Sequence, residues 1–475
     1  MATVPGGATR DRADASPTKK FFVSMLTRDI SLVDAILDLI DNSLDGALRL
    51  AGGKSEEVDY SKHVVDVKLN GEYFSITDNC GGISREVAKH YAFKMGRDPE
   101  DRRDLDAETI GMYGVGMKRA IFKMGRKARV DTRHSDDAFR VEISSEWLES
   151  PEWDPLPISA LSDVDFPEPG TTIVVEDLYP GVSKHFANAA FLNDLRNSVS
   201  EHFTLFLQRG LLIKINGERI KPVRVEVLMD DNETGPAPFV YQGTIDGVLV
   251  TIAVGLNTGE DVPDEDDVPE FERDRSARIA GWTVLCNDRA VIVGDKSRLT
   301  GWGDGIPLYH YQFSIITGIV EFKSPDAEKL PVTTTKRALD ASSHIWLETL
   351  AKMRQAMRIW INYTNKWKNH PRSDQTPFWK NAKAVSLAEA VEKIRTRTGA
   401  VKTDGHIEYN PMKKKVLPFP KESKPTSRRI VFSRPINEIK LLAEELFDDP
   451  DTKPGIVGDR CFQLVLNKVK NREGL

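Results

Sequence analysis

The stretch Asp34 to Ala47, DAILDLIDNSLDGA, constrains the fold of this chain more than any other. At about 100° per residue its apolar residues fall on one face of a helix, while its four aspartates and its asparagine fall on the other. Surface helices usually mix acidic and basic residues that pair four positions apart, and this polar face carries no base. The face is therefore either a solvated acidic surface or a binding site for a cation.

Three residues of the polar face converge on one patch. Asp38, Asn42 and Asp45 are spaced i, i+4 and i+7, so their side chains lie along one side of the helix. Carboxylate and carboxamide oxygens are hard ligands that suit Mg²⁺, which takes only a few protein oxygens and keeps several waters. The helix by itself thus indicates a metal-phosphate site as the alternative to a solvated face.

A predicted β-hairpin follows the helix. An Asn-Gly pair at positions 70–71 lies between two apolar runs, and Asn-Gly readily adopts a type I′ turn. The second strand leads into Asp78 and then into Gly81 and Gly82. Asp78 either starts a turn, or it accepts a hydrogen bond from an exocyclic amine such as that of adenine. In the second case the glycines let the base lie against bare backbone.

A glycine-rich segment comes next. Residues 94–110 are highly charged and lack periodic apolar positions, as expected for a mobile lid. They run into Gly111 to Lys118, GMYGVGMK, which precedes a helix-forming sequence. Glycines that open a helix present backbone N–H groups and the positive end of the helix dipole to an anion, and Lys118 adds a charge. The segment fits neither a Walker A loop nor a Rossmann fingerprint.

Four stretches occur in order over about 140 residues: DLIDNSLDGA, DNCGGI, IGMYGVGMK and GTTIVV, the last a predicted strand at 170–175. Together they resemble the nucleotide-binding domain of the GHKL superfamily, the gyrase B, heat-shock chaperone, histidine kinase and MutL group that has the Bergerat fold. The IGxYGxGxK form of the third stretch looks most like the microrchidia (MORC) ATPases and their bacterial relatives. The resemblance implies an α/β-sandwich domain that binds ATP and Mg²⁺.

The resemblance also assigns roles to single residues. Asn42 would coordinate Mg²⁺, Asp78 would hold the adenine amine, and Gly82 would lie beneath the base. Gly114, Gly116 and Lys118 would hold the phosphates, and Thr171 would support the adenine side. The full set that it assigns to nucleotide binding is Asn42, Asp45, Asp78, Gly82, Ile83, Gly111, Gly114, Val115, Gly116, Met117, Lys118 and Thr171.

Two positions depart from the family pattern. Asp38 occupies the position of the general base, where the family usually has Glu. Asp is one methylene shorter, and a misplacement of about 1 Å costs on the order of 10²-fold in rate. Cys80 replaces the first glycine of the usual DxGxG, and Gly81 supplies the freedom one residue later. The pattern supports nucleotide binding more strongly than hydrolysis.

A β-rich region is predicted beyond residue 207, beginning with a second Asn-Gly hairpin at 211–220 and ending in Leu330 to Arg337, LPVTTTKR. In gyrase B, MutL and microrchidia-like proteins, a transducer domain follows the nucleotide domain and sends a lysine to the γ-phosphate. The resemblance makes Lys336 that residue, with a catalytic role beside Asp38. The alternative is a surface lysine in a polar turn. Residues 342–367 open with a Ser cap and predict a long stalk helix.

The remainder of the chain is basic, because residues 366–434 hold 17 Lys and Arg against 6 Asp and Glu. It is expected to alternate linker with helices at 380–396, 436–447 and 460–469. Basic residues with aromatic residues between them can contact DNA phosphates and stack on bases, and a solvated linker is the alternative. The residues concerned are Lys413 to Lys415, Arg428, Arg429, Trp379, Tyr409 and Phe419.

The whole chain of 475 residues therefore predicts an α+β protein of several parts. Its three cysteines are far apart in sequence, and no stretch is apolar enough for a leader or a membrane span, so we expect a cytoplasmic protein. The expected parts are a disordered segment 1–20, an ATP-binding domain 21–207, a transducer-like domain 208–341, the stalk helix 342–367 and a basic, partly helical region 368–475.

The resemblance implies a Mg²⁺-dependent ATPase that acts as a conformational clamp, forms a homodimer on binding ATP, and acts on DNA or on a partner protein. The alternative is a regulatory module that senses ATP without hydrolysing it, which the Asp at position 38 favours.

Overall fold

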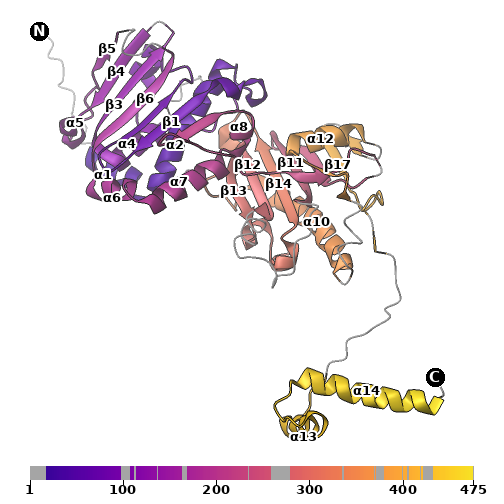
Figure 1. Ribbon diagram of the computed structural model, residues 1–475. Helices are drawn as coiled ribbons and strands as arrows, with labels where there is room; N and C mark the ends of the chain where they lie inside the picture. The colour runs from indigo at the N-terminus through magenta and orange to yellow at the C-terminus, as the bar shows by residue number, and fades with distance from the viewer. Residues whose placement is uncertain are drawn as a thin grey trace, which may run out of the picture. The chain divides into compact units, whose positions relative to one another are not determined.

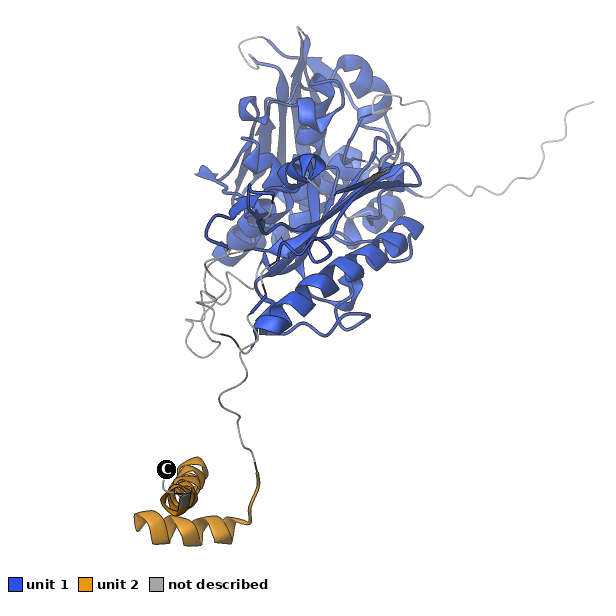
Figure 2. Cartoon of the chain, turned by 90° about the vertical axis from the view of Figure 1, so that its right-hand side faces the viewer, with its two compact units in different colours: residues 1–420 blue, residues 421–475 orange. Residues whose placement is uncertain are grey.

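The computed structural model contains two compact units, residues 1–420 and 421–475 (Figure 2). It describes residues 18–97, 107–111, 114–135, 137–162, 168–233, 235–257, 279–333, 336–368, 370, 379–397, 400–403, 406–417, 419–420 and 432–473.

The first sheet has eight strands in the order β5-β4-β3-β6-β2-β1-β7-β8 (Figure 1). All neighbours are antiparallel except β1 and β7. The strands are β1 Val64–Leu69, β2 Phe74–Asp78, β3 Gly125–His134, β4 Asp137–Ile143, β5 Ile158–Ala160, β6 Gly170–Leu178, β7 Leu212–Ile215 and β8 Glu218–Arg219. The accompanying helices are α1 Lys19–Arg28, α2 Leu32–Leu50, α3 Arg85–Val87, α4 Gly116–Met124, α5 Ser145–Glu149, α6 Pro180–Phe186, α7 Ala189–His202 and α8 Thr204–Gln208.

Helix α2 is the central helix of the first core. Ser31 caps it, because its Oγ accepts the Asp34 N–H at 3.0 Å. The predicted apolar face is buried together with residues of α4, α7 and the strands. Packed in this way, α2 places its polar face against the end of β2 and against the segment before α4.

The hairpin at 211–220 belongs to this first sheet and not to the β-rich region. Strand β7 pairs in parallel with β1, from Val64 opposite Leu212 to Val67 opposite Ile215. Side chains of β7 point into the first core, with Ile213 and Ile215 buried. The Asn-Gly turn identified the hairpin correctly, but a turn signal carries no information about the sheet that a hairpin joins.

The second sheet has seven strands in the order β13-β12-β14-β11-β10-β17-β16. They are β10 Phe239–Ile245, β11 Val248–Leu256, β12 Gly281–Cys286, β13 Arg289–Asp295, β14 Ile316–Lys323, β16 Val401–Thr403 and β17 His406–Tyr409, while β9 Val227–Met229 and β15 Lys383–Val385 form a separate pair. Helix α10, His344–Trp367, packs on one face and α12, Leu387–Thr396, on the other (Figure 1). Because successive side chains of a strand point to opposite faces, Ile252 and Val254 of β11 enter the core beside α10, and Ala253 enters the core beside α12.

Much of the expected basic linker is part of this second sheet. Strand β17 pairs with β10, and α12 packs beneath it, so residues from 379 to 417 contribute to the two cores. Trp379 and Tyr409 are buried, at 4% and 1% exposure. The expectation that these two rings stack on bases is therefore wrong, whereas Phe419 and Lys413 to Lys415 are exposed. Arg428 and Arg429 lie outside the described residues.

Two further expectations concern segments that the structure describes only in part. Residues 1–17 of the expected disordered segment lie outside the described residues, but Lys19 and Lys20 belong to α1, and Lys19 is buried against Trp147. Of the expected lid at 94–110, residues 98–106 lie outside the described residues.

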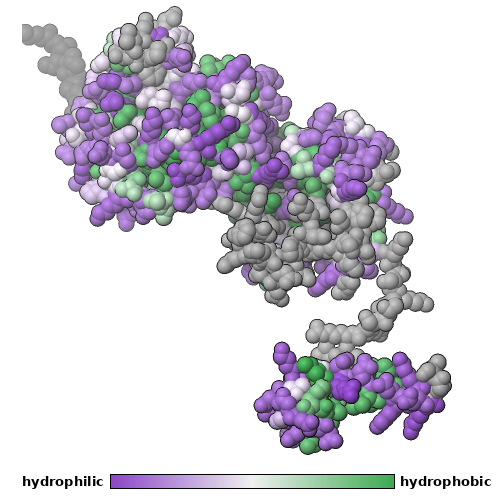
Figure 3. Space-filling view, viewed as in Figure 1, coloured by the Kyte–Doolittle hydropathy of each residue, from purple (hydrophilic) through white to green (hydrophobic). Residues whose placement is uncertain are grey.

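The second unit contains helices α13, Ile436–Phe447, and α14, Pro454–Glu473. The bounds of α13 match the predicted helix, and α14 is longer than predicted. Apolar side chains lie on the surface of both helices (Figure 3). Those with the highest exposed fraction are Ile436, Leu441, Ile456, Phe462 and Val465. None of the described helices in either unit is long and apolar enough to cross a membrane.

Candidate functional site

A cavity of about 400 Å³ lies within the first unit between α2, the end of β2 and the start of α4. Its volume is within the roughly 300–1,000 Å³ of small-molecule sites. All the residues predicted to bind the nucleotide or to act in catalysis line this cavity: Asp38, Asn42, Asp45, Asp78, Gly82, Ile83, Gly111, Gly114, Val115, Gly116, Met117, Lys118, Thr171 and Lys336. We call its surroundings near Asp78 the Asp78 region, and those near Asp38 and Lys336 the Lys336 region.

Asp78 is held by neutral donors. It is the last residue of β2, where its carboxylate accepts the Ser43 hydroxyl at 2.7 Å and the Cys80 N–H at 2.9 Å. Burial raises the pKa of Asp78 above its ordinary value, and these hydrogen bonds, with one from the Thr171 backbone, offset only part of the shift. Asp78 also lines the cavity, and each of its carboxylate oxygens has a second lone pair with which to accept a hydrogen bond.

The loop after Asp78 lies directly against neighbouring backbone. Gly82 has φ +69°, and a Cβ atom there would lie 1.9 Å from the carbonyl oxygen of Arg133. Thr132 orders the same loop from β3: its hydroxyl accepts the Ile83 N–H at 2.8 Å and donates to the Gly170 carbonyl at 3.0 Å. Only glycine fits at position 82, so the wall of the cavity here is bare backbone, as the sequence predicted.

Asp45 connects α2 to the glycine-rich segment. Its two carboxylate oxygens accept the N–H groups of Ile110 and Gly111 at 2.8 and 2.9 Å. A Cβ atom on Gly111 would lie 2.7 Å from the same carboxylate. Asp45 therefore lines the cavity as a positioning group for this segment, and its contacts explain why residue 111 has no side chain.

The end of the glycine-rich segment opens α4, which starts at Gly116 after Val115. Gly114 has φ +63°, a conformation that favours glycine. Lys118 is buried and its Nζ donates to the Ala92 carbonyl at 2.9 Å and to the Gly114 carbonyl. The predicted phosphate lysine thus lies beside the glycine loop and joins it to the segment around Ala92.

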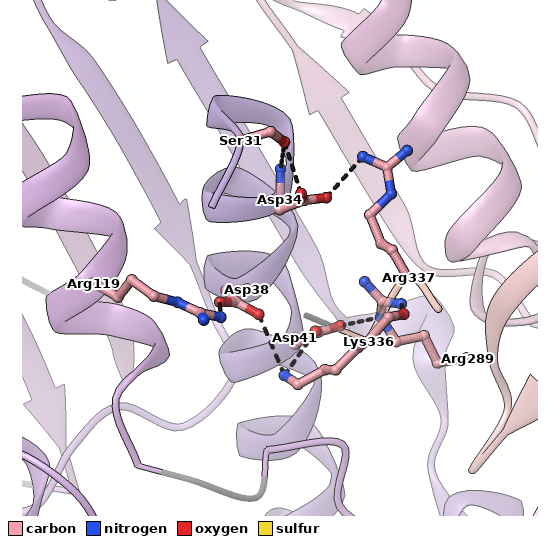
Figure 4. Close-up of polar contacts among 8 residues, drawn as sticks. All are labelled: Ser31, Asp34, Asp38, Asp41, Arg119, Arg289, Lys336 and Arg337. Atoms are coloured by element: carbon pink, nitrogen blue, oxygen red, sulfur yellow. Dashed lines mark hydrogen bonds and ion pairs between the residues drawn. The ribbon is translucent and has the colours of Figure 1, made fainter. Parts of the chain in front are cut away.

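The Lys336 region is built from ion pairs (Figure 4). The Asp38 carboxylate pairs with Arg119 of α4, and its other oxygen is 3.5 Å from Lys336 Nζ. The next acid along α2, Asp41, is completely buried and accepts from Arg289 Nε at 2.8 Å and from Lys336 Nζ at 2.9 Å. Each acid of α2 here faces cations contributed by other elements.

These ion pairs set the charges of the buried groups. Burial alone would raise the pKa of Asp41, but the charges of Arg289 and Lys336 outweigh it and hold that pKa below its ordinary value. Burial alone would lower the pKa of Lys336, but Asp41 and Asp38 outweigh it and hold that pKa above its ordinary value. The carboxylate of Asp41 and the ammonium of Lys336 are therefore both charged at neutral pH.

Lys336 reaches α2 from a short loop that follows β14. Val332 and Leu339 pair across the base of this loop, and the Lys336 N–H donates to the Thr333 carbonyl at 2.9 Å. Lys336 itself has φ +56°, which is uncommon outside glycine. The neighbouring Arg337 donates to Asp34 at 2.7 Å, one turn earlier on α2. The alternative of an ordinary surface lysine is therefore wrong, because Lys336 is buried.

The donor set around α2 fits a metal held by few protein ligands. Asp38 and Asp45 are engaged by Arg119 and by backbone amides, respectively, while Asn42 is exposed and lines the cavity. Among the described residues no group of three or more His, Cys, Asp or Glu side chains could hold a metal. Asn42 would thus be the protein ligand of an Mg²⁺ ion whose other ligands come from phosphates and water.

Four residues in or beside the site were not predicted from the sequence: Ser43, Thr132, Arg119 and Arg289. Ser43 lies within the stretch DLIDNSLDGA and Arg119 directly follows the stretch IGMYGVGMK, and both line the cavity. Arg289 has no local signal beyond its place after the Asn-Asp turn of the β12–β13 hairpin. Asp41 lies on the predicted polar face of α2, but it is completely buried and pairs with Arg289 and Lys336.

Comparison with protein families found a match for the part of the chain that forms most of this cavity. Residues 30–185 match the family model described as histidine kinase-, DNA gyrase B-, and HSP90-like ATPase. Comparison with curated proteins found no significant match. The matched segment includes α2, the Asp78 region and the glycine-rich segment, which are the elements that form most of the cavity wall. This match assigns residues 30–185 to the ATPase domain of the GHKL superfamily.

Proposed function

We propose that the chain binds ATP with Mg²⁺ in this cavity and acts as an ATP-dependent conformational clamp of the microrchidia or MutL kind. The single observation that carries the proposal is the position of Lys336. This lysine lies about 160 residues after the last cavity residue of the first sheet, Ile173, and yet it lines the same cavity. A site that joins two sheets in this way couples its ligand to their relative position.

The two regions of the cavity suit the two ends of ATP. The Asp78 carboxylate accepts the exocyclic amine of adenine, and the bare backbone at Gly82 supports the base. The Lys336 region, with Arg119 and Lys118 nearby, provides cations for the phosphates. When bound, Mg²⁺ neutralises part of the phosphate charge, with Asn42 as its protein ligand.

Asp38 is the residue that orients and deprotonates the attacking water in this proposal. In the structure its carboxylate is paired with Arg119 and lies near Lys336. To act as a base it must exchange Arg119 for water, and the phosphates of bound ATP offer Arg119 an alternative partner. Asp38→Asn is expected to abolish multiple-turnover hydrolysis while ATP still binds; turnover at the wild-type rate would exclude Asp38 as the base.

A second candidate function is an ATP-sensing module that does not hydrolyse its ligand. The Asp38–Arg119 ion pair favours it, because a paired and shorter acid is a poor base. A single-turnover experiment with excess protein separates the two functions. The module predicts that ATP is recovered intact after hours, and the ATPase predicts ADP and phosphate.

The clamp proposal also includes dimerisation and a client. DNA is one candidate client, supported by the exposed Lys413 to Lys415, and a partner protein is the other. Mass in solution with a non-hydrolysable ATP analogue, with and without DNA, tests the proposal. The expected results are a dimer only with the analogue, and salt-dependent DNA binding that weakens when the three lysines are changed to alanine. A monomer under all conditions would contradict the clamp.

A further inference from the structure

We propose that Arg289 is a positioning residue that holds the Lys336 ammonium where it can distinguish ATP from ADP, and that it does so by binding both Asp41 and the backbone of Lys336. This inference rests on the proposed function and extends it to a residue of the second sheet that does not line the cavity.

The contacts of Arg289 are specific. It is the first residue of β13, after a turn in which Asn287 and Asp288 both have positive φ. Its Nε donates to Asp41 Oδ1 at 2.8 Å and its Nη1 donates to the Lys336 carbonyl at 2.7 Å (Figure 4). With 1% exposure it is fixed by the protein on all sides. One guanidinium therefore fixes the acid that Lys336 pairs with and the backbone from which Lys336 extends.

The carbonyl contact matters because of the conformation of Lys336. A non-glycine residue at φ +56° is strained, and such a conformation persists only where its surroundings hold it. The bond from Arg289 to the carbonyl, and the bond from the Lys336 N–H to Thr333, hold both sides of the residue. The side chain is thereby directed to α2 and not to solvent.

The charges buried around Asp41 indicate how Arg289 affects the Lys336 ammonium. Two carboxylates, Asp38 and Asp41, face three cations, Arg119, Arg289 and Lys336. With Arg289 present, Asp41 is already neutralised on its other oxygen, so Lys336 can leave it for a phosphate without stranding a buried charge. Without Arg289, Lys336 would be the only cation among the described residues that contacts Asp41. The ammonium is then retained by the acid and withheld from the ligand.

A second arginine of the loop provides a matched control. Arg337 pairs with Asp34 on the same helix at 2.7 Å, so it also anchors the loop to α2. Its side chain is 34% exposed, and its ion pair does not involve Asp41. If Arg289 only fastened the loop, removing either arginine would have similar effects on nucleotide preference.

The test is calorimetric titration of the full chain with ADP and with a non-hydrolysable ATP analogue, both with Mg²⁺. For Arg289→Met we expect the preference for the ATP analogue over ADP to fall about tenfold, the effect of one charge-assisted contact. For Arg337→Met we expect less than about a twofold change, because its pair is partly exposed. In a Lys336→Ala background, Arg289→Met should change the preference no further.

The outcomes separate this inference from the proposed function. A folded Arg289→Met protein that keeps the wild-type preference, or a loss that adds fully to that of Lys336→Ala, would overturn the role of Arg289. If Arg289→Met does not fold, Arg289→Lys serves instead, since one ammonium neutralises Asp41 but cannot reach both acceptors; it should still lose several-fold preference. A wild-type chain that binds neither nucleotide would overturn the proposed function, and this inference with it.

Discussion

Two aspartates beside the same cavity, the half-buried Asp78 and the fully buried Asp41, have different kinds of partner. Asp78 is surrounded by a hydroxyl and backbone N–H groups, and burial raises its pKa. Asp41 has two cationic partners, which outweigh burial and lower its pKa. The difference shows that one cavity contains a hydrogen-bonding region and an ionic region. The hydrogen-bonding region suits an uncharged nucleobase. The ionic region suits phosphate groups, whose charge differs between ATP and ADP.

The comparison makes distinct predictions about ligands. A change in the Asp78 region should affect all adenine nucleotides alike, because ATP and ADP share the base. A change in the Lys336 region should affect mainly the nucleotide with the γ-phosphate. The following experiments test this division.

The largest effect is expected at the backbone of the Asp78 region. Gly82→Ala would place a Cβ atom 1.9 Å from the Arg133 carbonyl oxygen in a left-handed conformation, so backbone must move. We expect a loss of about 3–5 kcal/mol in the free energy of unfolding, measured by denaturant titration. Gly217→Ala is the control, since Gly217 has φ +81° but open space around it; it should cost only about 1 kcal/mol. Equal losses would show that strain alone matters.

Asp78→Asn should be next in size. The amide replaces an acceptor oxygen by a donor, so both ADP and the ATP analogue should lose on the order of 10²-fold in affinity, by equal factors. The measurement is titration of both ligands. Asp66→Asn on the neighbouring strand β1, outside the cavity lining, should leave both affinities unchanged. A selective loss of the ATP analogue would contradict the division of the cavity.

Lys336→Ala should have a smaller and selective effect. Affinity for the ATP analogue should fall about tenfold, while that for ADP changes little, because the ammonium meets the γ-phosphate. Lys329→Ala, an exposed lysine just before the same loop, is the control and should change neither affinity. Equal losses of both nucleotides after Lys336→Ala would remove Lys336 from the γ-phosphate.

An effect of about the same size, on stability and not on affinity, concerns pH. Burial, with the charge of Arg289, lowers the pKa of His202 to about 3, against about 6.5 in an unfolded chain. The unfolded state therefore binds a proton first as the pH falls, and the contribution of neutral His202 is complete above pH 6.5 and is lost toward pH 3. At pH 5.5 this costs about 1.4 kcal/mol.

His202→Gln tests this directly, because glutamine can still donate to the Ala290 carbonyl that His202 contacts. The free energy of unfolding should fall less between pH 7.5 and pH 5.5 in the variant than in the wild type. Parallel pH profiles would show that His202 is not the group that titrates.

Local patterns predicted the parts of the site that are local in structure. The faces of α2 follow from helical periodicity, and Asp78, Gly82 and the glycine-rich segment follow from residue types that only certain turns accept. Lys336 was predictable only through the family resemblance. Arg289 was not predictable, because an arginine after a hairpin turn acquires its role from Asp41, a residue of another sheet's helix. The helix expected at 380–396 is confirmed for residues 387–396, which form α12, whereas residues 383–385 form strand β15. Strands β16 and β17 lie where a linker was expected, because short strands are weak patterns among basic residues.

The separation of Asp41 and Lys336 along the chain has a consequence for biosynthesis. Their contact closes a loop of 295 residues, compared with 35 for Ser43 and Asp78; in entropy this costs only about 2 kcal/mol more. The two contacts differ more in the time that passes between the synthesis of their two residues. At roughly 5–20 residues per second, a ribosome that has made Asp41 needs roughly 15–60 s to complete the 295 residues up to Lys336. During the first 248 residues of that interval the contact between Ser43 and Asp78 can form, whereas neither cationic partner of Asp41 has yet been synthesised.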